Sequence, residues 1–131
     1  MAFVFLMLGG ALGTLSRYLV TAASQAVTPG SFPLGTVVVN VVGCYLIGLL
    51  SGLRQLSFLP PAWYLTLGTG FLGAFTTFSS FALDAHTLGR EGAWSRATLY
   101  VLANLVLGYL ALVMGRATAL RLGPSPFQPE P

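Results

Sequence analysis

The segment that decides the fold is GAFTTFSSF, from Gly73 to Phe81, which contains four hydroxyl side chains, three phenyl rings and no charge. It lies inside an apolar run at about 62–88. A helix of that length can cross about 30 Å of hydrocarbon at about 1.5 Å per residue. Polar groups are costly in hydrocarbon unless they find partners, so this cluster calls for a structural or functional reason.

The rest of the chain has the composition of a membrane protein. Of its 131 residues 55% are apolar and 7% are charged, whereas soluble domains have about 25% charged residues. Further apolar runs occupy about 2–23, 32–53 and 97–117. We therefore predict an all-α integral membrane protein with four transmembrane helices in one domain, 1–117, followed by a Pro-rich C-terminal tail, 118–131.

The third apolar run is longer than a straight crossing needs, so it either tilts or breaks within the membrane. Its glycines weaken a helix, and its hydroxyl groups can bond the backbone groups that a break releases. These residues are Gly68, Gly70, Gly73, Thr76, Thr77, Ser79 and Ser80. We predict a third helix broken near mid-membrane, whose released carbonyls suit a small cation. Alternatively, the hydroxyls only bond the preceding helical turn.

Rings and amides near this segment suit an anion. Phe75, Phe78 and Phe81 follow a spacing that places them on roughly one helix face, and the edge of a phenyl ring is electropositive. Asn40 and Asn104 interrupt two other apolar runs. The rings could equally be core or lipid-facing groups, and the amides could equally join helices.

Charged residues are few and leave several interpretations open. Arg17 could extend to the membrane interface or attract anions to a vestibule. Asp84 could cap a helix, pair with an arginine or line a water-filled mouth. With one Cys, one His and three acidic residues, the chain cannot build a common metal cage, and it has no pair of residues suited to enzymatic catalysis. Its arginines form no cluster that would suit nucleic acid.

The arginines do not define an orientation in the membrane. With four spans, one face would carry Arg54, Arg116 and Arg121, and the other Arg17, Arg90 and Arg96. Because the positive-inside rule depends on a difference between the faces, either a weaker signal decides or copies insert both ways. Antiparallel copies could pair about a two-fold axis, and a pore would need the second copy because four short helices enclose little space.

The chain resembles the Fluc/CrcB family of bacterial fluoride channels. The segments that carry the resemblance are GGALGTLSRY, FPLGTVVVNVVGCYLIG and GTGFLGAFTTFSSFALD, with a looser match in YVLANLVLGYLALVMG. The resemblance implies a fluoride-selective channel in the bacterial inner membrane, formed by an antiparallel, dual-topology homodimer with two pores and a structural sodium ion at its centre. It also implies protection of the cell against fluoride toxicity.

The resemblance further implies roles for individual residues. Fluoride would contact the ring edges of Phe78 and Phe81 and the amide of Asn40, and Arg17 would lie in the vestibule. Backbone carbonyls of Gly73 and Thr76 would hold sodium. The remaining positions that match the pore are Thr77, Ser79, Tyr100 and Asn104. Members of the family often carry a row of hydroxyl side chains along the fourth helix. In the matching row of this chain only Asn104 has a polar side chain.

Two other functions remain open from the residues alone. A small four-helix proton-coupled exporter would need a carboxylate inside the membrane, typically in the first span, and no acidic residue precedes Asp84. A membrane assembly subunit without transport activity would conduct no ion. A flux assay driven by a pH gradient separates the exporter from the channel, and the absence of any ion flux from purified protein would indicate the assembly subunit.

Overall fold

The computed structural model describes residues 2–28 and 32–123, and this part of the chain is helical without a strand. In order, the elements are α1 (Ala2–Val27), α2 (Leu34–Gln55), α3 (Pro61–Tyr64), the π-helical η1 (Leu65–Leu72), α4 (Gly73–Phe75), α5 (Phe78–Arg90), α6 (Trp94–Leu102), the π-helical η2 (Ala103–Leu107) and α7 (Gly108–Leu120).

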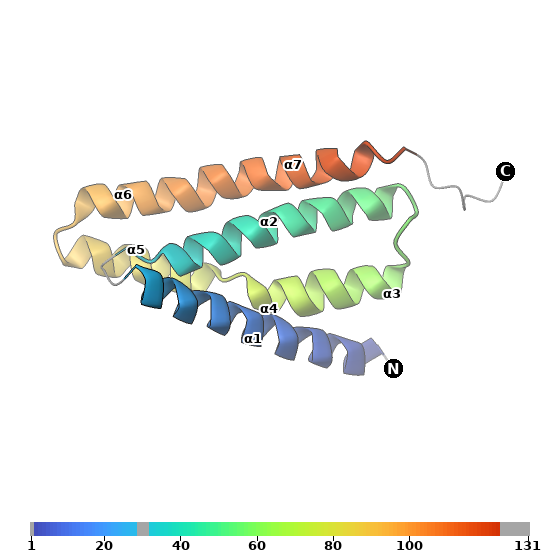
Figure 1. Ribbon diagram of the computed structural model, residues 1–131, viewed down its shortest axis with the longest axis horizontal. Coiled ribbons are helices and arrows are strands. Elements are labelled where there is room, and N and C mark those ends of the chain that lie inside the picture. The colour runs from blue at the N-terminus through green and yellow to red at the C-terminus, as the bar shows by residue number, and fades with distance from the viewer. Residues whose placement is uncertain (1, 29–31, 124–131) are drawn as a thin grey trace, which may run out of the picture.

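The elements run back and forth along one long axis. In Figure 1, α6 and α7 form one row beside α2, α3 and α4 lie between α2 and α1, and α5 continues from α4 toward α6. The beginning of α1, the turn from α2 to α3 and the end of α7 lie at the same end of the bundle. Residues far apart in sequence on α2, α5 and η2 are thereby brought together near the middle of the molecule.

Within residues 2–28 and 32–123, three helical segments have the length and hydropathy to cross a membrane: Ala2–Val27, Leu34–Gln55 and Trp94–Leu120, the last made of α6, η2 and α7. Most of their large apolar side chains are exposed, including Phe3, Leu12 and Tyr109. Such extensive exposed apolar surface is unfavourable in water and favourable in lipid. The chain is a multi-pass membrane protein, as its composition predicts.

Glycines set the spacing between the packed helices. The contact between α2 and α7 is the most extensive in the structure. A Cβ atom on Gly48 would clash with the carbonyl oxygen of Leu112, and one on Gly115 with that of Tyr45. On α1, a Cβ atom on Gly9 would lie 2.8 Å from the Thr66 carbonyl oxygen. Small residues thus allow these helix backbones to approach closely, as they do in other membrane helix pairs.

The segment between α4 and α5 is not helical. Thr76 and Thr77 have extended backbone conformations, with φ and ψ of −79° and 159° for Thr76 and −151° and 116° for Thr77. The Thr77 hydroxyl then accepts a hydrogen bond from the Ser80 backbone N–H and so caps α5. A Thr N-cap satisfies one of the free donors at a helix start, which explains why α5 begins at Phe78.

Helices extend beyond several of the predicted spans. α1 continues to Val27 and α7 to Leu120, because the hydrophobic pattern marks only the part of a helix that can lie in hydrocarbon and helices continue into polar residues. Residues 118–120 of the predicted tail belong to α7, and Gly123 ends the described chain. The remainder of the tail, 124–131, lies outside the described residues.

Candidate functional site

The side chain of Asn40, on α2, bonds the extended backbone at Thr77. Its Oδ1 accepts a hydrogen bond from the Thr77 backbone N–H at 2.9 Å, and its Nδ2 donates to the Thr77 carbonyl at 3.2 Å. An extended residue inside a helical bundle has no regular backbone partner, so these two bonds replace the ones that the interruption removes. Asn40 therefore holds the connection between α4 and α5 against α2.

Asn104, on η2, extends this network to a third segment. Asn40 Nδ2 donates to Asn104 Oδ1 at 2.9 Å, and Asn104 Nδ2 donates to the Tyr100 carbonyl at 3.0 Å. Asn104 is 9% exposed and Tyr100 is fully buried. The amides thus join segments of the bundle, which is one of the two interpretations of these asparagines, and their contact with an ion stays a prediction.

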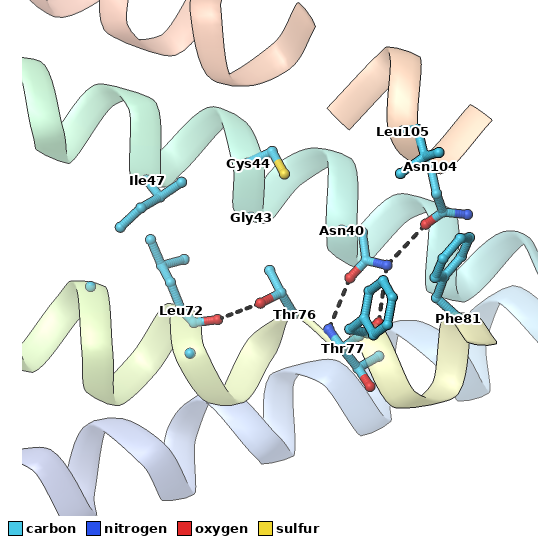
Figure 2. A pocket seen from close by; sticks show the side chains of 13 residues that line it. Asn40, Gly43, Cys44, Ile47, Leu72, Thr76, Thr77, Phe81, Asn104 and Leu105 are labelled. Carbon is cyan, nitrogen blue, oxygen red and sulfur yellow. Dashed lines mark hydrogen bonds between the residues drawn. The ribbon is translucent and has the colours of Figure 1, made fainter. Parts of the chain in front are cut away.

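An open cavity of about 350 Å³ lies against this network. Figure 2 shows Asn40 between Thr77 and Asn104, with Phe81 beside them. The cavity is lined by uncharged residues from α2, η1, α4, α5 and η2, and by the extended connection. They are Asn40, Gly43, Cys44, Ile47, Gly68, Leu72, Gly73, Thr76, Thr77, Phe78, Phe81, Asn104 and Leu105.

Hydroxyl groups at the interruption divide into two kinds. Thr76 Oγ1 donates to the Leu72 carbonyl at 3.0 Å, which is the ordinary bond to the preceding turn. The Thr77 hydroxyl instead lies 3.0 Å from Ser80 Oγ and 3.3 Å from Ser79 Oγ. Thr77 is buried, whereas Ser79 is exposed, so the cluster reaches from the interior to the surface of the chain.

Phe78 and Phe81 both line the cavity but differ in burial. Their ring centroids are 5.4 Å apart at an interplanar angle of 52°. Phe81 is 8% exposed and contacts Tyr100 at a centroid distance of 5.6 Å, whereas Phe78 is 77% exposed. The third ring, Phe75, instead stacks on Phe71 at 5.8 Å and is absent from the cavity lining.

Asp84 accepts two hydrogen bonds on one carboxylate oxygen. Thr36 Oγ1 donates to Asp84 Oδ2 at 2.9 Å and the Tyr100 hydroxyl donates to the same atom at 3.0 Å. Thr36 is absent from the residues that the sequence analysis selects. Thr36 lies four residues before Asn40, and residues at that spacing share a helix face. This spacing could have indicated that Thr36 lies near the site.

Asp84 also borders a second, more polar cavity of about 520 Å³ between α1, α2 and α5. Ser80 and Thr36 line it as well. Thr77 and Phe81 line the first cavity, and Ser80 and Asp84 line the second. The first turns of α5 therefore border both cavities. Arg17 is half-buried on α1, one turn before Thr21, and lies outside the lining of either cavity.

The interruption redirects two backbone donors. In a continuous helix the Thr77 N–H would bond the Gly73 carbonyl and the Ser80 N–H would bond the Thr76 carbonyl. Here the first donates to Asn40 and the second to the Thr77 hydroxyl. Gly73 and Thr76 line the first cavity, and their carbonyls have lost their regular helical donors.

Helices of membrane-spanning length around an uncharged cavity that a few amide and hydroxyl groups border define a multi-pass membrane protein. The chain belongs to the CrcB family: the family model described as CrcB-like protein, Camphor Resistance (CrcB), matches residues 4–116. The resemblance noted from the sequence is thereby confirmed.

Several relatives carry the name Fluoride-specific ion channel FluC. One from Maridesulfovibrio salexigens is 40% identical over 116 residues, which cover 88% of this chain and 92% of the relative. One from Solibacter usitatus is 42% identical over 122 residues, covering 92% and 100%. One from Nitratidesulfovibrio vulgaris is 44% identical over 117 residues, covering 88% and 94%.

Proposed function

We propose that this protein is a fluoride-selective ion channel of the bacterial inner membrane, which lets fluoride leave the cell passively and so protects it from fluoride toxicity. The observation that carries the proposal is the uncharged cavity in which Phe78, Phe81 and two asparagines meet. Relatives along nearly the whole chain bear the name of a fluoride-specific channel. On this proposal the chain is a channel and not an enzyme, an exporter or an assembly subunit.

Fluoride is small and strongly hydrated, so a pore has to replace its water with other donors. The amides of Asn40 and Asn104 and the hydroxyls of Thr77 and Ser79 are neutral donors, which bind an anion without trapping it as a fixed charge would. The edges of Phe78 and Phe81 add weak positive potential. The two rings contact each other at 5.4 Å between centroids, so an ion would meet their edges, and a larger halide would fit such edge contacts poorly.

The proposed path runs along α5. An ion would pass from the polar cavity bordered by Ser80 and Asp84, past Phe81 and Tyr100, to the cavity bordered by Thr77 and Asn104. Arg17 would attract anions toward the vestibule from α1 through its long-range potential. It needs no contact with the cavity lining for that role.

A second, antiparallel copy would complete the pore. Phe78 is 77% exposed although it borders the cavity, and on this proposal a partner chain would enclose it. The equal number of arginines on the two membrane faces is compatible with copies inserted in opposite directions. We therefore propose a dual-topology homodimer with two pores. Each copy would contribute four transmembrane helices in a domain of residues 1–117, with the third helix broken near mid-membrane and a tail of 118–131.

A structural sodium ion fits the backbone at the interruption. The carbonyls of Gly73 and Thr76 have lost their regular donors, and carbonyl oxygens are hard ligands that suit small hard cations. Two oxygens are fewer than such a cation takes, and a second copy would supply two more. Bound there, sodium would add central positive charge and join the two chains.

Fluoride efflux from liposomes that contain the purified protein tests the function. We expect rapid efflux of fluoride and none of chloride from the same vesicles. Phe78→Ile and Phe81→Ile should sharply lower fluoride efflux while the dimer still assembles, because isoleucine removes the polarised ring edge. Equal efflux of both ions, or of neither, would contradict the proposal, and unchanged efflux in both variants would contradict the role of the rings.

A further inference from the structure

A third cavity, of about 460 Å³, lies where α2 turns into α3. Its lining combines one cation and one hydroxyl group with an apolar wall, and consists of Arg54, Ser57, Phe58, Leu59, Pro60 and Pro61. Figure 1 shows this turn at the opposite end of the bundle from the end of α5. None of the six residues lines either of the two cavities described above, so this cavity is separate from the proposed path of the ion.

The guanidinium group of Arg54 is oriented by a ring and keeps its charge. Its Cζ lies 4.5 Å from the centroid of the Tyr64 ring, and a cation–π contact holds the group without neutralising it. In the described part of the chain the acidic residues are Asp84 and Glu91, and both line the second cavity, beside α5. Arg54 is exposed, so its planar set of N–H donors can reach an anion, and this geometry suits a phosphate group.

Two further arginines make this end of the bundle positive. Arg116 donates to Gln55 Oε1 at 2.8 Å, so a neutral amide holds it beside the end of α2. Arg121 directly follows α7, whose end lies at the same end of the bundle as the turn from α2 to α3 (Figure 1). The charges of the three arginines therefore add to one positive potential, which attracts anionic lipid at the surface of a membrane.

The third cavity lies at the depth of lipid headgroups. α2 is an apolar span that ends at Gln55, one residue after Arg54, and arginine at the end of a span is typical of the membrane interface. Trp63, two residues after Pro61, is 57% exposed, and tryptophan is enriched at the same depth. A headgroup phosphate can therefore reach Arg54 while the attached acyl chain stays in the hydrocarbon.

We infer that the third cavity binds the headgroup of an anionic phospholipid, with the phosphate on Arg54 and the Ser57 hydroxyl and the start of an acyl chain on Phe58 and Leu59. The apolar wall favours a lipid over free phosphate. A zwitterionic lipid carries the same phosphate together with a cation, which the three arginines repel, so phosphatidylglycerol should bind more tightly than phosphatidylcholine. The inference depends on the chain's place in a membrane and is independent of fluoride conduction.

Quenching of tryptophan fluorescence by brominated lipid measures this binding. Trp94→Phe leaves Trp63 as the only tryptophan of the chain. Protein with this substitution, in detergent micelles, is titrated with phosphatidylglycerol that carries bromine in its acyl chains, and with phosphatidylcholine of the same chains as the control. We expect saturable quenching, half complete at a phosphatidylglycerol concentration about fivefold lower than that of phosphatidylcholine. Half-quenching concentrations within about twofold of each other would overturn the inference.

Two variants in the same background locate the binding. Arg54→Gln removes the cation of the cavity and should abolish the preference for phosphatidylglycerol. Arg96→Gln removes an exposed arginine of α6 and should leave the preference unchanged. Equal loss in the two variants would show attraction by net charge alone and would overturn the site at Arg54.

Inorganic phosphate distinguishes a lipid from a free anion. Added at the concentration of the brominated phosphatidylglycerol, it should leave the quenching of Trp63 unchanged, because it cannot contact the apolar wall as an acyl chain does. Full recovery of the fluorescence would overturn the assignment to a lipid. This competition and the comparison of the two lipids use protein that retains Arg54, so they remain decisive if Arg54→Gln fails to fold.

Discussion

Replacing Gly13 by alanine tests whether close contact of α1 with the interrupted segment supports the site. A Cβ atom there would clash with the Phe71 carbonyl oxygen and would lie 3.0 Å from the Phe71 carbonyl carbon and 3.1 Å from the Phe75 nitrogen. These are backbone atoms, which cannot rotate away as a side chain can. Alanine at this position should therefore push α1 away from η1 and α4, just before the interruption at Thr76.

Gly10→Ala on the same helix is the matched control. Its Cβ atom would meet its nearest neighbour, the Gly70 carbonyl oxygen, at 3.9 Å, which is ordinary contact. Both variants gain up to about 1 kcal/mol from the helix preference of alanine, and only Gly13→Ala adds an overpacking cost of about 1–3 kcal/mol. We therefore expect Gly13→Ala to be about 2 kcal/mol less stable than Gly10→Ala.

Unfolding in mixed micelles with a rising fraction of denaturing detergent measures this difference, with the fluorescence of Trp63 and Trp94 as the signal. Fluoride efflux of the same variants should fall for Gly13→Ala and stay unchanged for Gly10→Ala. If the two stabilities agree within about 0.5 kcal/mol, the size expected of a substitution without a structural effect, the reasoning about backbone contact is refuted.

Three further substitutions have expected effects that the same unfolding assay measures. Tyr100→Phe removes one of the two donors to Asp84 and should lower the free energy of unfolding by about 1–3 kcal/mol. Tyr109→Phe, at an exposed tyrosine of α7, should leave it unchanged. Equal effects of the two substitutions would contradict the role of the carboxylate. Gly115→Ala places a Cβ atom against a carbonyl oxygen of α2 and should cost about 1–3 kcal/mol, so a stabilised variant would exclude the clash. Thr77→Val removes the hydroxyl that caps α5 and should cost about 1 kcal/mol, while Thr77→Ser keeps most of that stability; identical losses would show that the cap is unimportant.

The membrane class could be predicted from the sequence, and the role of the site residues stays a prediction. Low charge and long apolar runs are visible in the sequence itself, so a membrane protein can be recognised without knowledge of its packing. Asn40, Thr77, Phe81 and Asn104 line one cavity, in keeping with their selection as polar or aromatic residues at unusual positions. The sodium ion and the two-copy assembly stay predictions.

The pairing of these residues could not be predicted. Asp84 bonds Thr36 and Tyr100, which belong to two other helices, and such partners depend on how each helix is rotated about its axis. The π-helical turns of η1 and η2 change that rotation, because each places an extra residue in a turn. Asn104 lies in η2, so its direction depends on a feature that hydrophobic periodicity does not reveal.

The glycine contacts between α2 and α7 have a consequence for how the protein moves. Gly48 and Gly115 each lie against a carbonyl of the opposite helix, so sliding of these two helices meets steric resistance. Separation would break their packing and the hydrogen bond that Arg116 donates to Gln55 at 2.8 Å. Asn40 lies on α2, and Asn104 lies on η2, directly before α7. The packed pair of helices therefore holds both asparagines in place. Any movement needed for an ion to pass therefore falls to groups outside this pair of helices, such as the exposed ring of Phe78.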